Sequence, residues 1–291
     1  MAMKIYTQQY AGMLPNIFEA KSAYLRAFGG SIQTIVGAEA DEDYLKLKIS
    51  DTDVVIQNYS TDANVGFGTG TGNSNRFGPR KEVKSIDMQV PFDAPLSIHE
   101  GIDRYTVNDI PEQVVAERLA LHAVAWAERY DSIMKTVISE QASETLTGAL
   151  SEAGVTKLFA DARKAFVNNK VSNSIAWVAY VTADVYNFLI DSELAKTDKK
   201  SSVNIDNQTM YKFKGFELVE LPDDKFVETE NAYFVADGVG QAGVAIPVTR
   251  TFESEDFAGV ALQGAGKLGK FIPEKNEKAI LKAELVAIPA G

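Results

Sequence analysis

The amino-acid sequence predicts a mixed α+β fold, and three stretches carry that prediction. Residues 108–141 have the periodicity of one long amphipathic helix. Residues 44–92, which precede it, combine glycine-rich sequence with the alternating pattern of strands. Residues 148–291, which follow it, mix helical and strand patterns. The helix therefore divides the chain into an extended part and a more compact part.

The long helix has clear start signals and a continuous apolar stripe. Asp109 is placed to cap it, Pro111 falls in its first turn, and Glu112 completes a capping box. Spacings of three and four residues then place one set of side chains on a single face. That set is Val115, Leu119, His122, Trp126, Tyr130, Ile133 and Val137. We predict that Val115, Leu119, His122, Trp126 and Ile133 form the structural core of this helix.

Residues 1–43 contain a modest helix pattern, LPNIFEAKSAYLRAFGG, which the paired Gly29 and Gly30 end. This segment is either a helix packed on the core or an arm that reaches a neighbouring subunit. Residues 44–92 contain two alternating stretches, YLKLKIS and SIDMQVPF, which read as strands. The residues between them carry few large apolar side chains and cannot bury themselves. We therefore predict a long two-stranded hairpin with a glycine-rich tip.

The sequence after the long helix alternates between helical and strand patterns. TLTGALSEAGV reads as a linker, VTKLFADARKAFVNN as a helix and SIAWVAYVT as a buried strand. Thr182 is predicted to cap the short helix ADVYNFLIDSEL. The polar stretch KTDKKSSVNIDNQT reads as a loop that is either exposed to solvent or a contact at an assembly axis. The later segments read as strands. No internal repeat is visible.

Composition excludes several classes of protein. The chain has 291 residues, of which 45% are hydrophobic, so it is long enough to bury one large core or two smaller ones. It contains no cysteine, which excludes disulfides and thiolate metal sites and fits a reducing cytoplasm. No apolar run reaches the ~18 residues of a membrane span. A net charge of −11 argues against a general nucleic-acid binder.

The sequence predicts no catalytic, cofactor or metal site. The glycines of residues 66–72 are followed by polar residues and a further strand, where a phosphate loop requires a helix. His99, Glu100 and Asp103 lie in a strand-like stretch and do not have the spacing of a helical zinc motif. His122 lies on the apolar stripe, so we interpret it as a packed core histidine.

One basic cluster stands out in this acidic chain. Arg76, Arg80, Lys81 and Lys84 lie close together in the predicted hairpin, and Phe77 lies among them. They either form a solvated loop or contact an acidic surface of a neighbouring subunit. We take Arg76, Phe77, Arg80, Lys81 and Lys84 as candidate intersubunit contacts.

The order of these pieces resembles the major capsid protein of tailed bacteriophages, which has the Hong Kong 97-type fold. The hairpin with its glycine-rich tip and the helix segment QVVAERLALHAVAWAERYDSIM carry part of the likeness. KGFELVELPDDKF and FESEDFAGVALQGAGKLGKFIPEKNEKAILK carry the rest. The likeness spans nearly the whole chain. It depends on the order of elements, because none of these segments is a sharp signature.

The resemblance implies a division of the chain into functional parts. Residues 1–43 would be the N-terminal arm and 44–92 the extended β-hairpin loop. Residues 93–147 would form the peripheral domain with its long spine helix, and 148–250 the axial α/β domain. Residues 251–291 would be strands returning to the peripheral domain. In some members a hairpin lysine is linked to an asparagine of another subunit. Lys81, Lys84 and Asn276 lack a matching context, so we expect no such link here.

The resemblance also implies partners. The chain would assemble with copies of itself into the hexamers and pentamers of a head shell, in the host cytoplasm, and remain in the virion. Only about 40 residues precede the hairpin, so we expect a separate scaffolding protein or an already processed chain, together with a portal. The packaged DNA would be enclosed without sequence-specific binding, and an acidic inner wall would let it slide. No membrane partner is expected.

Two other functions remain open at the level of sequence. One is a cellular shell of the same fold, an encapsulin-like compartment, whose inner face would bind a cargo peptide in an apolar groove. The other is a soluble α/β enzyme whose site is not visible in the sequence. That enzyme would require a deep pocket with convergent polar groups.

Overall fold

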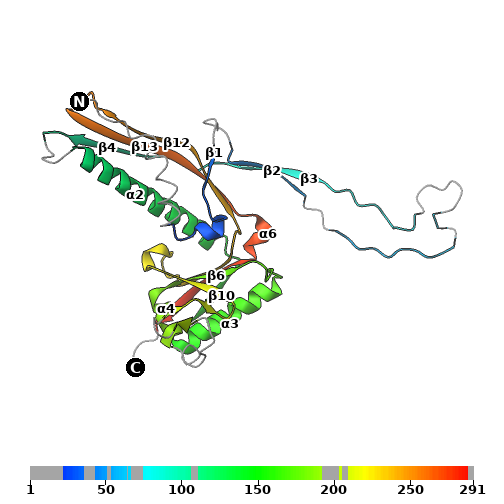
Figure 1. The fold of residues 1–291 in the computed structure, drawn as a ribbon. Coiled ribbons are helices and arrows are strands. Elements are labelled where there is room, and N and C mark those ends of the chain that lie inside the picture. Colours follow the sequence, from blue (N-terminus) through cyan, green and yellow to red (C-terminus); the bar gives the residue numbers. More distant parts are fainter. Residues whose placement is uncertain are drawn as a thin grey trace. The chain divides into compact units, whose positions relative to one another are not determined.

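The computed structural model describes residues 22–35, 43–50, 54–63, 65–66, 75–105, 111–191, 203–204 and 209–287. The chain divides into two compact units. One unit is Asp41–Pro91, and the other combines Met1–Ala40 with Phe92–Gly291. Within the second unit, two sheets and the helices packed on them make up the body of the protein (Figure 1).

The first unit is the predicted hairpin. Strands β2 (Leu45–Ser50) and β3 (Ser85–Val90) pair antiparallel, with Leu45 opposite Val90 and Ser50 opposite Ser85. The alternating stretches of the sequence are thus confirmed as strands. Residues 64 and 67–74, which include most of the predicted glycine-rich tip, lie outside the described residues.

A four-stranded sheet supports the long helix in the second unit. Its strand order is β1 (Gln33–Ile35), β12 (Gln241–Glu253), β13 (Gly259–Phe271) and β4 (Leu96–Asp103). β12 and β13 form a long antiparallel hairpin, and β13 also pairs antiparallel with β4. Helix α2 (Pro111–Glu140) lies along this sheet (Figure 1).

Helix α2 confirms the long helix predicted from periodicity. Its first described residue is Pro111, so the predicted cap at Asp109 lies outside the described residues. The helix is buried on two sides. One side is the predicted stripe, and the other contains Ala127, Met134 and Ile138. Packing on two sides explains why a helix this long holds its position in the body of the unit.

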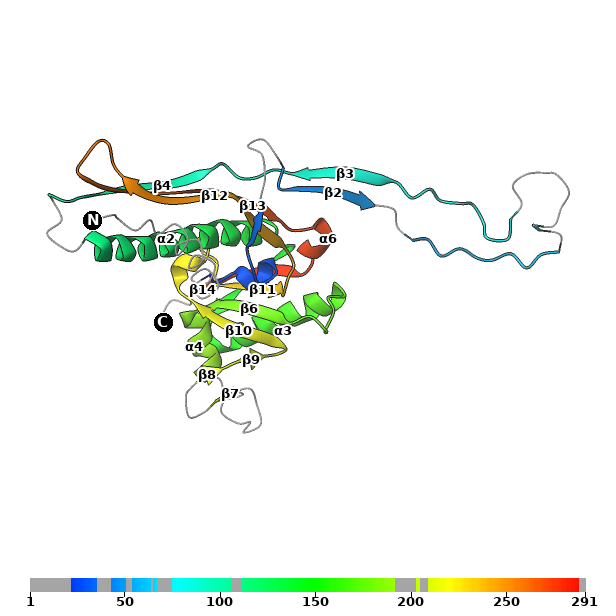
Figure 2. The same ribbon diagram turned by 45° about the horizontal axis from the view of Figure 1, so that its top comes forward.

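A six-stranded mixed sheet forms the centre of the compact part. Its order is β5 (Glu144–Leu150), β14 (Ile280–Ala287), β11 (Ala232–Ala236), β6 (Trp177–Thr182), β10 (Phe216–Leu221) and β9 (Lys212–Phe213). Helices α3 (Glu152–Asn168) and α4 (Ala183–Asp191) lie on the side of this sheet away from α2 (Figure 2). Ser151 caps α3, because its side chain accepts a hydrogen bond from the Gly154 amide.

The two faces of this sheet bury different sets of rings. On the α3 face, Phe159 packs edge-on against Phe234 with ring centroids 5.0 Å apart, and Phe166 packs against Trp177. On the opposite face, Tyr24 of the N-terminal segment packs against Tyr180 at 5.0 Å. Every residue of β6 is buried, which matches the continuous apolar run of the sequence.

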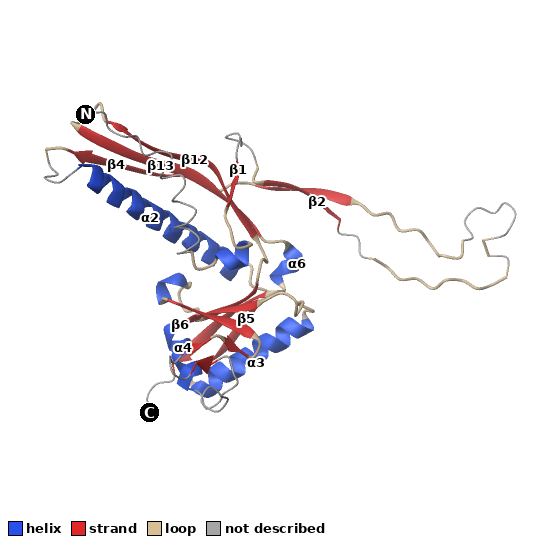
Figure 3. Ribbon diagram, in the orientation of Figure 1, coloured by secondary structure: helices blue, strands red, loops and turns tan. Residues whose placement is uncertain are grey.

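The second unit also contains shorter elements, of which Figure 3 labels α6 and Figure 2 labels β7 and β8. They are the 3-10 helices η1 (Leu25–Phe28) and η2 (Asp223–Lys225), the one-turn helix α6 (Glu274–Glu277), and the strand pair β7 (Val203–Asn204) and β8 (Thr209–Met210). The remaining residues of the predicted polar loop 196–209 lie outside the described residues.

Several predictions of local structure differ from what the structure contains. The N-terminal helix pattern ends in η1, and residues 22–24 before it are not helical; residues 14–21 lie outside the described residues. Residues 145–150 of the predicted linker form β5, because they pair in parallel with β14 from the end of the chain, and residues 152–155 begin α3. Thr182 does not cap α4, because its Oγ1 atom has no hydrogen-bond partner among the described residues.

The late strands are divided between the two sheets. β12 and β13 belong to the four-stranded sheet, whereas β14 pairs with β11 and β5 in the six-stranded sheet. The segment 251–291, predicted to return as a whole to the peripheral part, therefore contributes to both sheets. The boundary predicted at residue 250 falls inside β12 (Gln241–Glu253). Strand pairing across long sequence separations sets this division, and local patterns do not encode it.

Candidate functional site

The hairpin unit carries an apolar face that its own strands leave partly open. Leu45, Leu47, Met88 and Val90 lie on one face of the two-stranded ribbon, and Ile86 continues it. The side chain of Ile86 is 60% exposed and that of Met88 is 39% exposed. The opposite face carries Lys46, Lys48, Asp87 and Gln89. A two-stranded ribbon is only marginally stable alone in water, so this face is suited to a contact with another surface.

The two legs beyond the strands, residues 54–63 and 75–84, also expose apolar side chains. They carry Val54, Val55, Ile56, Tyr59, Phe77 and Val83. The legs are joined by an edge-on contact of Tyr59 with Phe77, at 5.2 Å between centroids, and by a hydrogen bond from the Ser60 amide to the Arg76 carbonyl. The Gln57 side chain donates to the Pro79 carbonyl at 3.0 Å. The legs thus hold a defined pairing and still leave apolar side chains on their surface.

The five candidate contact residues take different positions in this unit. Arg76 folds back onto the hairpin, where its Nε atom donates to the Val65 carbonyl at 2.9 Å. Phe77 remains 76% exposed although its ring touches Tyr59. Arg80, Lys81 and Lys84 are exposed, and Lys84 lies 3.8 Å from Glu82. Residues 75–84 hold four cations and one carboxylate, in a chain whose net charge is −11.

In the second unit, one end of α2 is tied to β4 by charged groups. Arg118 donates to both carboxylate oxygens of Glu100, and its Nε atom lies 2.8 Å from Oε2. The Nε2 atom of buried His122 lies 2.9 Å from the same oxygen. The hydrogen bonds from Arg118, together with His122, lower the pKa of Glu100 to about 2 against the opposing effect of burial. This arrangement joins a helix to a strand, and it has the geometry of a structural tie.

The structure places the five candidate core residues of α2 as follows. Val115, Leu119, His122 and Trp126 are buried, and Ile133 is partly buried against the main core. Trp126 and Tyr130 lie over glycines of β13. A Cβ atom at Gly264 would come within 3.3 Å of Trp126 Nε1, and one at Gly266 within 3.5 Å of the Tyr130 hydroxyl. The absence of side chains at these two positions lets the rings approach the sheet closely.

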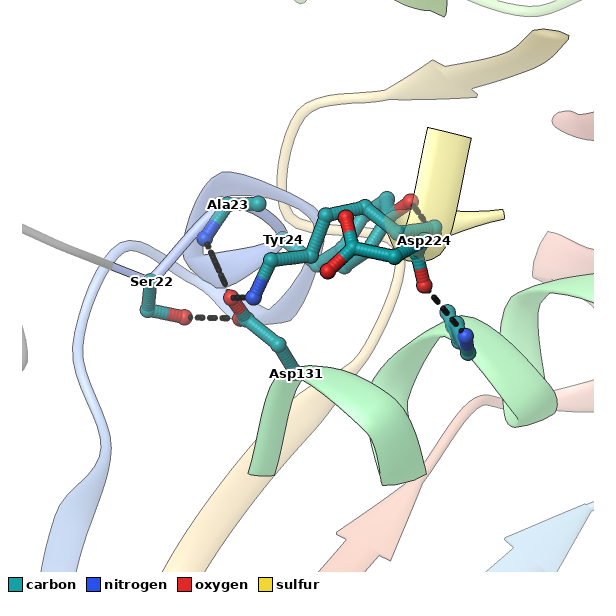
Figure 4. Close-up of polar contacts among 7 residues, drawn as sticks. Ser22, Ala23, Tyr24, Asp131 and Asp224 are labelled. Atoms are coloured by element: carbon teal, nitrogen blue, oxygen red, sulfur yellow. Dashed lines mark hydrogen bonds and ion pairs between the residues drawn. The ribbon is translucent and has the colours of Figure 1, made fainter. Parts of the chain in front are cut away.

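A buried carboxylate that the sequence pattern did not single out lies in α2. Asp131 is fully buried and accepts hydrogen bonds from the Ser22 hydroxyl at 2.7 Å and from the Ala23 amide (Figure 4). Lys225 donates to it at 3.1 Å. The signal for this residue was its position between Ala127 and Met134 on the second apolar side of the helix. A lone acid on an apolar helix face predicts a buried partner.

Glu230 is a second buried carboxylate that the sequence did not single out. It accepts from the Ser139 hydroxyl at 2.6 Å, from Lys282 at 2.8 Å and from the Tyr233 hydroxyl. Burial, followed by the hydrogen bond to Glu230, raises the pKa of Tyr233, which therefore stays protonated and donates. Like Asp131, Glu230 satisfies its charge entirely within the fold.

The described parts of the second unit offer no constellation for catalysis. An open groove of about 420 Å³ between α2 and β4 has Leu96, Ile133 and Val137 along it. A second open groove of similar volume lies beside Trp177, Lys212 and Glu217. Among the residues described, no three metal-binding side chains cluster together. Helices in the same parts of the chain are too short or too polar to cross a membrane.

Comparison with known proteins places the chain by its fold. No protein-family model and no curated protein matches its sequence. A chain of Mycobacterium phage Che8 matches with a TM-score of 0.63 at 16% identity, covering 97% of this chain and 93% of that one. The mature capsid of bacteriophage PhiM1 matches with a TM-score of 0.63 at 11% identity, over 88% and 86% of the two chains.

A structure from a cellular organism also matches. The virus-like particle from Pyrococcus furiosus has a TM-score of 0.52 at 12% identity, covering 96% of this chain and 99% of that one. At these identities the matches report architecture, and the phage structures agree with it over nearly the whole chain. The chain therefore has the fold of the capsid proteins of tailed bacteriophages, the Hong Kong 97-type fold.

Proposed function

We propose that this chain is the shell-forming subunit of a tailed-bacteriophage head, which encloses double-stranded DNA and has a structural rather than an enzymatic role. The observation that carries the proposal is the hairpin unit, whose apolar face and legs stay exposed within their own unit. A shell subunit must share such surfaces with several neighbours, because each copy contacts the next in rings that close and curve. The fold likeness to phage capsids supports the same function.

We further propose that the parts of the chain divide the work as in other capsids of this fold. Residues 1–43 act as an arm, and 44–92 as the extended loop that reaches another subunit. The separation of Asp41–Pro91 as a unit supports that division. The four-stranded sheet with α2 supports a peripheral part, and the six-stranded sheet an axial part around the capsomer axis. Arg80, Lys81 and Lys84 are the contacts at which a cationic leg meets an acidic neighbour.

The partners follow from this role. The subunit forms hexamers and pentamers with its own copies, and a separate scaffolding protein and a portal complete the head. Packaged DNA is held without reading its sequence. We expect no covalent link between Lys81 or Lys84 and Asn276. The Asn276 side chain already donates to the Val239 carbonyl at 2.7 Å in its own chain.

The test is to express the chain alone and with a candidate scaffolding protein and to image both by negative-stain microscopy. Regular shells, rings or curved sheets are expected in at least one condition. A discrete monomer at high concentration in both conditions would overturn the proposal. Denaturing electrophoresis of the assembled product checks the absence of covalent multimers.

A second function is an encapsulin-like cellular shell, which the likeness to the Pyrococcus furiosus particle favours. The two functions differ in what the particle contains. A phage head filled in its host holds nuclease-protected DNA, whereas a cellular compartment holds a cargo protein. Extraction of particles from the native host, followed by nuclease protection and mass spectrometry, distinguishes them.

A further inference from the structure

Two buried carboxylates lie where α2 meets the segment 222–231. Three side chains of α2, each four residues from the next, face this segment: Asp131, Lys135 and Ser139. Lys225 donates to Asp131 at 3.1 Å, and Lys135 donates to the Asp224 carbonyl at 2.7 Å. Ser139 donates to Glu230 at 2.6 Å. The result is a ladder of three contacts between the long helix and one loop of the compact part.

The two carboxylates of this ladder, Asp131 and Glu230, differ in their other hydrogen-bond donors. Asp131 also accepts hydrogen bonds from the N-terminal segment, namely from the Ser22 hydroxyl and the Ala23 amide (Figure 4). Glu230 instead binds Lys282 of β14. Only the Asp131 end, therefore, brings the N-terminal segment, α2 and the loop onto one carboxylate.

A second hydrogen bond joins the N-terminal segment directly to the loop 222–231. The Tyr24 hydroxyl donates to the Lys225 carbonyl, and burial, with nearby tyrosine and acidic groups adding to it, raises the pKa of Tyr24. Tyr24 is itself fully buried, beside Asp131. Lys225 is thus held by its side chain to α2 and by its carbonyl to the N-terminal segment.

We propose that Asp131 couples the N-terminal segment to the loop 222–231, so that the two are held or released together. The physical reason is that the carboxylate is fully buried, and each donor lowers the cost of burying it. If Ser22 and Ala23 move away from Asp131, water reaches its carboxylate and screens its attraction to Lys225. If Lys225 is lost, the remaining neutral donors must hold a buried charge alone. Linkage makes the effect reciprocal.

This coupling gives the fold a conformational device. Any contact that displaces Ser22 and Ala23 loosens the junction between α2 and the six-stranded sheet. Conversely, a contact that fixes the N-terminal segment stiffens that junction. The inference concerns the isolated subunit and stands whether or not the chain builds a phage head.

The decisive experiment removes a loop-side donor and measures the N-terminal side. In Lys225→Met, the charge is lost while the carbonyl that accepts from Tyr24 remains. Hydrogen exchange of the purified, unassembled chain is followed by mass spectrometry in a peptide covering Leu25–Gly30. The Ala27, Gly29 and Gly30 amides of this peptide make backbone hydrogen bonds. We expect exchange there to rise by about fivefold or more, the lower end of typical coupling between sites.

The matched control is Lys282→Met. Lys282 is 23% exposed and pairs with buried Glu230, as Lys225, 20% exposed, pairs with buried Asp131. In the described part of the chain, Lys282 bonds to Ser139 and Glu230 and not to the N-terminal segment. We expect Lys282→Met to leave exchange in Leu25–Gly30 at the wild-type rate.

Two outcomes would overturn the proposal. If Lys225→Met leaves the exchange of Leu25–Gly30 within twofold of wild type, Asp131 binds its partners independently. If both lysine variants raise it equally, the effect is a general loss of stability.

Tyr24→Phe provides a second readout that keeps the ring and removes only the hydroxyl. It should raise exchange at the Phe226 amide, which bonds to the Asp223 carbonyl, and an unchanged rate there would also count against the coupling.

Discussion

At the scale of single residues, three buried or partly buried carboxylates of the described residues act inside the fold. Arg118 and His122 contact Glu100, whereas Asp131 and Glu230 each accept hydrogen bonds from one lysine and from at least one hydroxyl group, so each carboxylate is paired. This pairing explains why these three carboxylates, within the part of the chain that the structure describes, are not arranged for acid–base chemistry. These three carboxylates hold helices and strands in place.

Glu100 gives the chain a defined dependence on pH. Its pKa falls from 4.5 to about 2 on folding, so its stabilising contribution is present above pH 4.5 and is lost as the pH falls towards 2. Glu100→Gln should therefore lower the melting temperature at pH 7, and the difference from wild type should shrink between pH 4.5 and 3. Thermal melts across this range check it. Glu128→Gln, on the exposed side of α2, is the control, and a constant difference for Glu100→Gln contradicts the prediction.

Trp126 is the largest side chain on the stripe of α2, and its ring packs over Gly264 of β13. Trp126→Ala should lower the free energy of unfolding by about 3–5 kcal/mol, because the vacated space has no neighbouring side chain on the strand to fill it. Denaturant titration of the unassembled chain measures this. Leu121→Ala, at a position 52% exposed, should change the free energy by about 0.5 kcal/mol or less. Equal losses for both variants would show that Trp126 is not a core residue.

At the scale of elements, the hairpin and α2 differ in how much of their apolar surface the chain itself covers. α2 is covered on two sides by the chain's own residues, whereas the β2–β3 ribbon has an apolar face that remains partly exposed. An element of the first kind contributes to the stability of the subunit. One of the second kind contributes to contacts that form only when another surface covers it.

The apolar face of the ribbon can be tested without disturbing the fold. The double variant Ile86→Thr with Met88→Thr keeps strand propensity and makes this face polar. Assembly, followed by light scattering, should require several times more protein, while the melting temperature of the unassembled chain stays within ~2 °C of wild type. Gln89→Thr, on the opposite face, should leave both measurements unchanged. A large drop in melting temperature for the double variant would place this face in the subunit core.

At the scale of the whole molecule, the chain is acidic with one basic leg. Such a distribution favours contact between copies, since the cationic residues 75–84 meet an overall anionic surface. It also gives assembly a dependence on ionic strength, because exposed charges are screened by salt.

Arg80→Ala should leave the subunit folded and weaken assembly at low salt, and the difference from wild type should fade as salt is raised. The measurement is the threshold concentration for assembly at two ionic strengths. Lys164→Ala removes an exposed cation from α3 and serves as the control. If Arg80→Ala unfolds the unassembled chain instead, the hairpin belongs to the core and the proposed division of the chain fails.

Local pattern was enough to predict much of this fold. The ribbon strands 45–50 and 85–90 and the helix Pro111–Glu140 follow from periodicities of two and about three and a half residues. The buried strand Trp177–Thr182 follows from its continuous apolar run. These elements depend on neighbours close in sequence. Their order along the chain also carried the resemblance to phage capsids, because that order survives when individual residues change.

The sequence by itself therefore determined the α+β class, the long helix, the hairpin and their order. Only the tertiary structure decided which sheet each late strand joins and which acids are buried. β5 exists because it pairs with β14, more than a hundred residues away, and Asp131 is satisfied by Ser22, at a separation of 109 residues. Periodicity reports which face of an element is apolar, but the partner that covers the face or pairs the charge is set by packing in three dimensions.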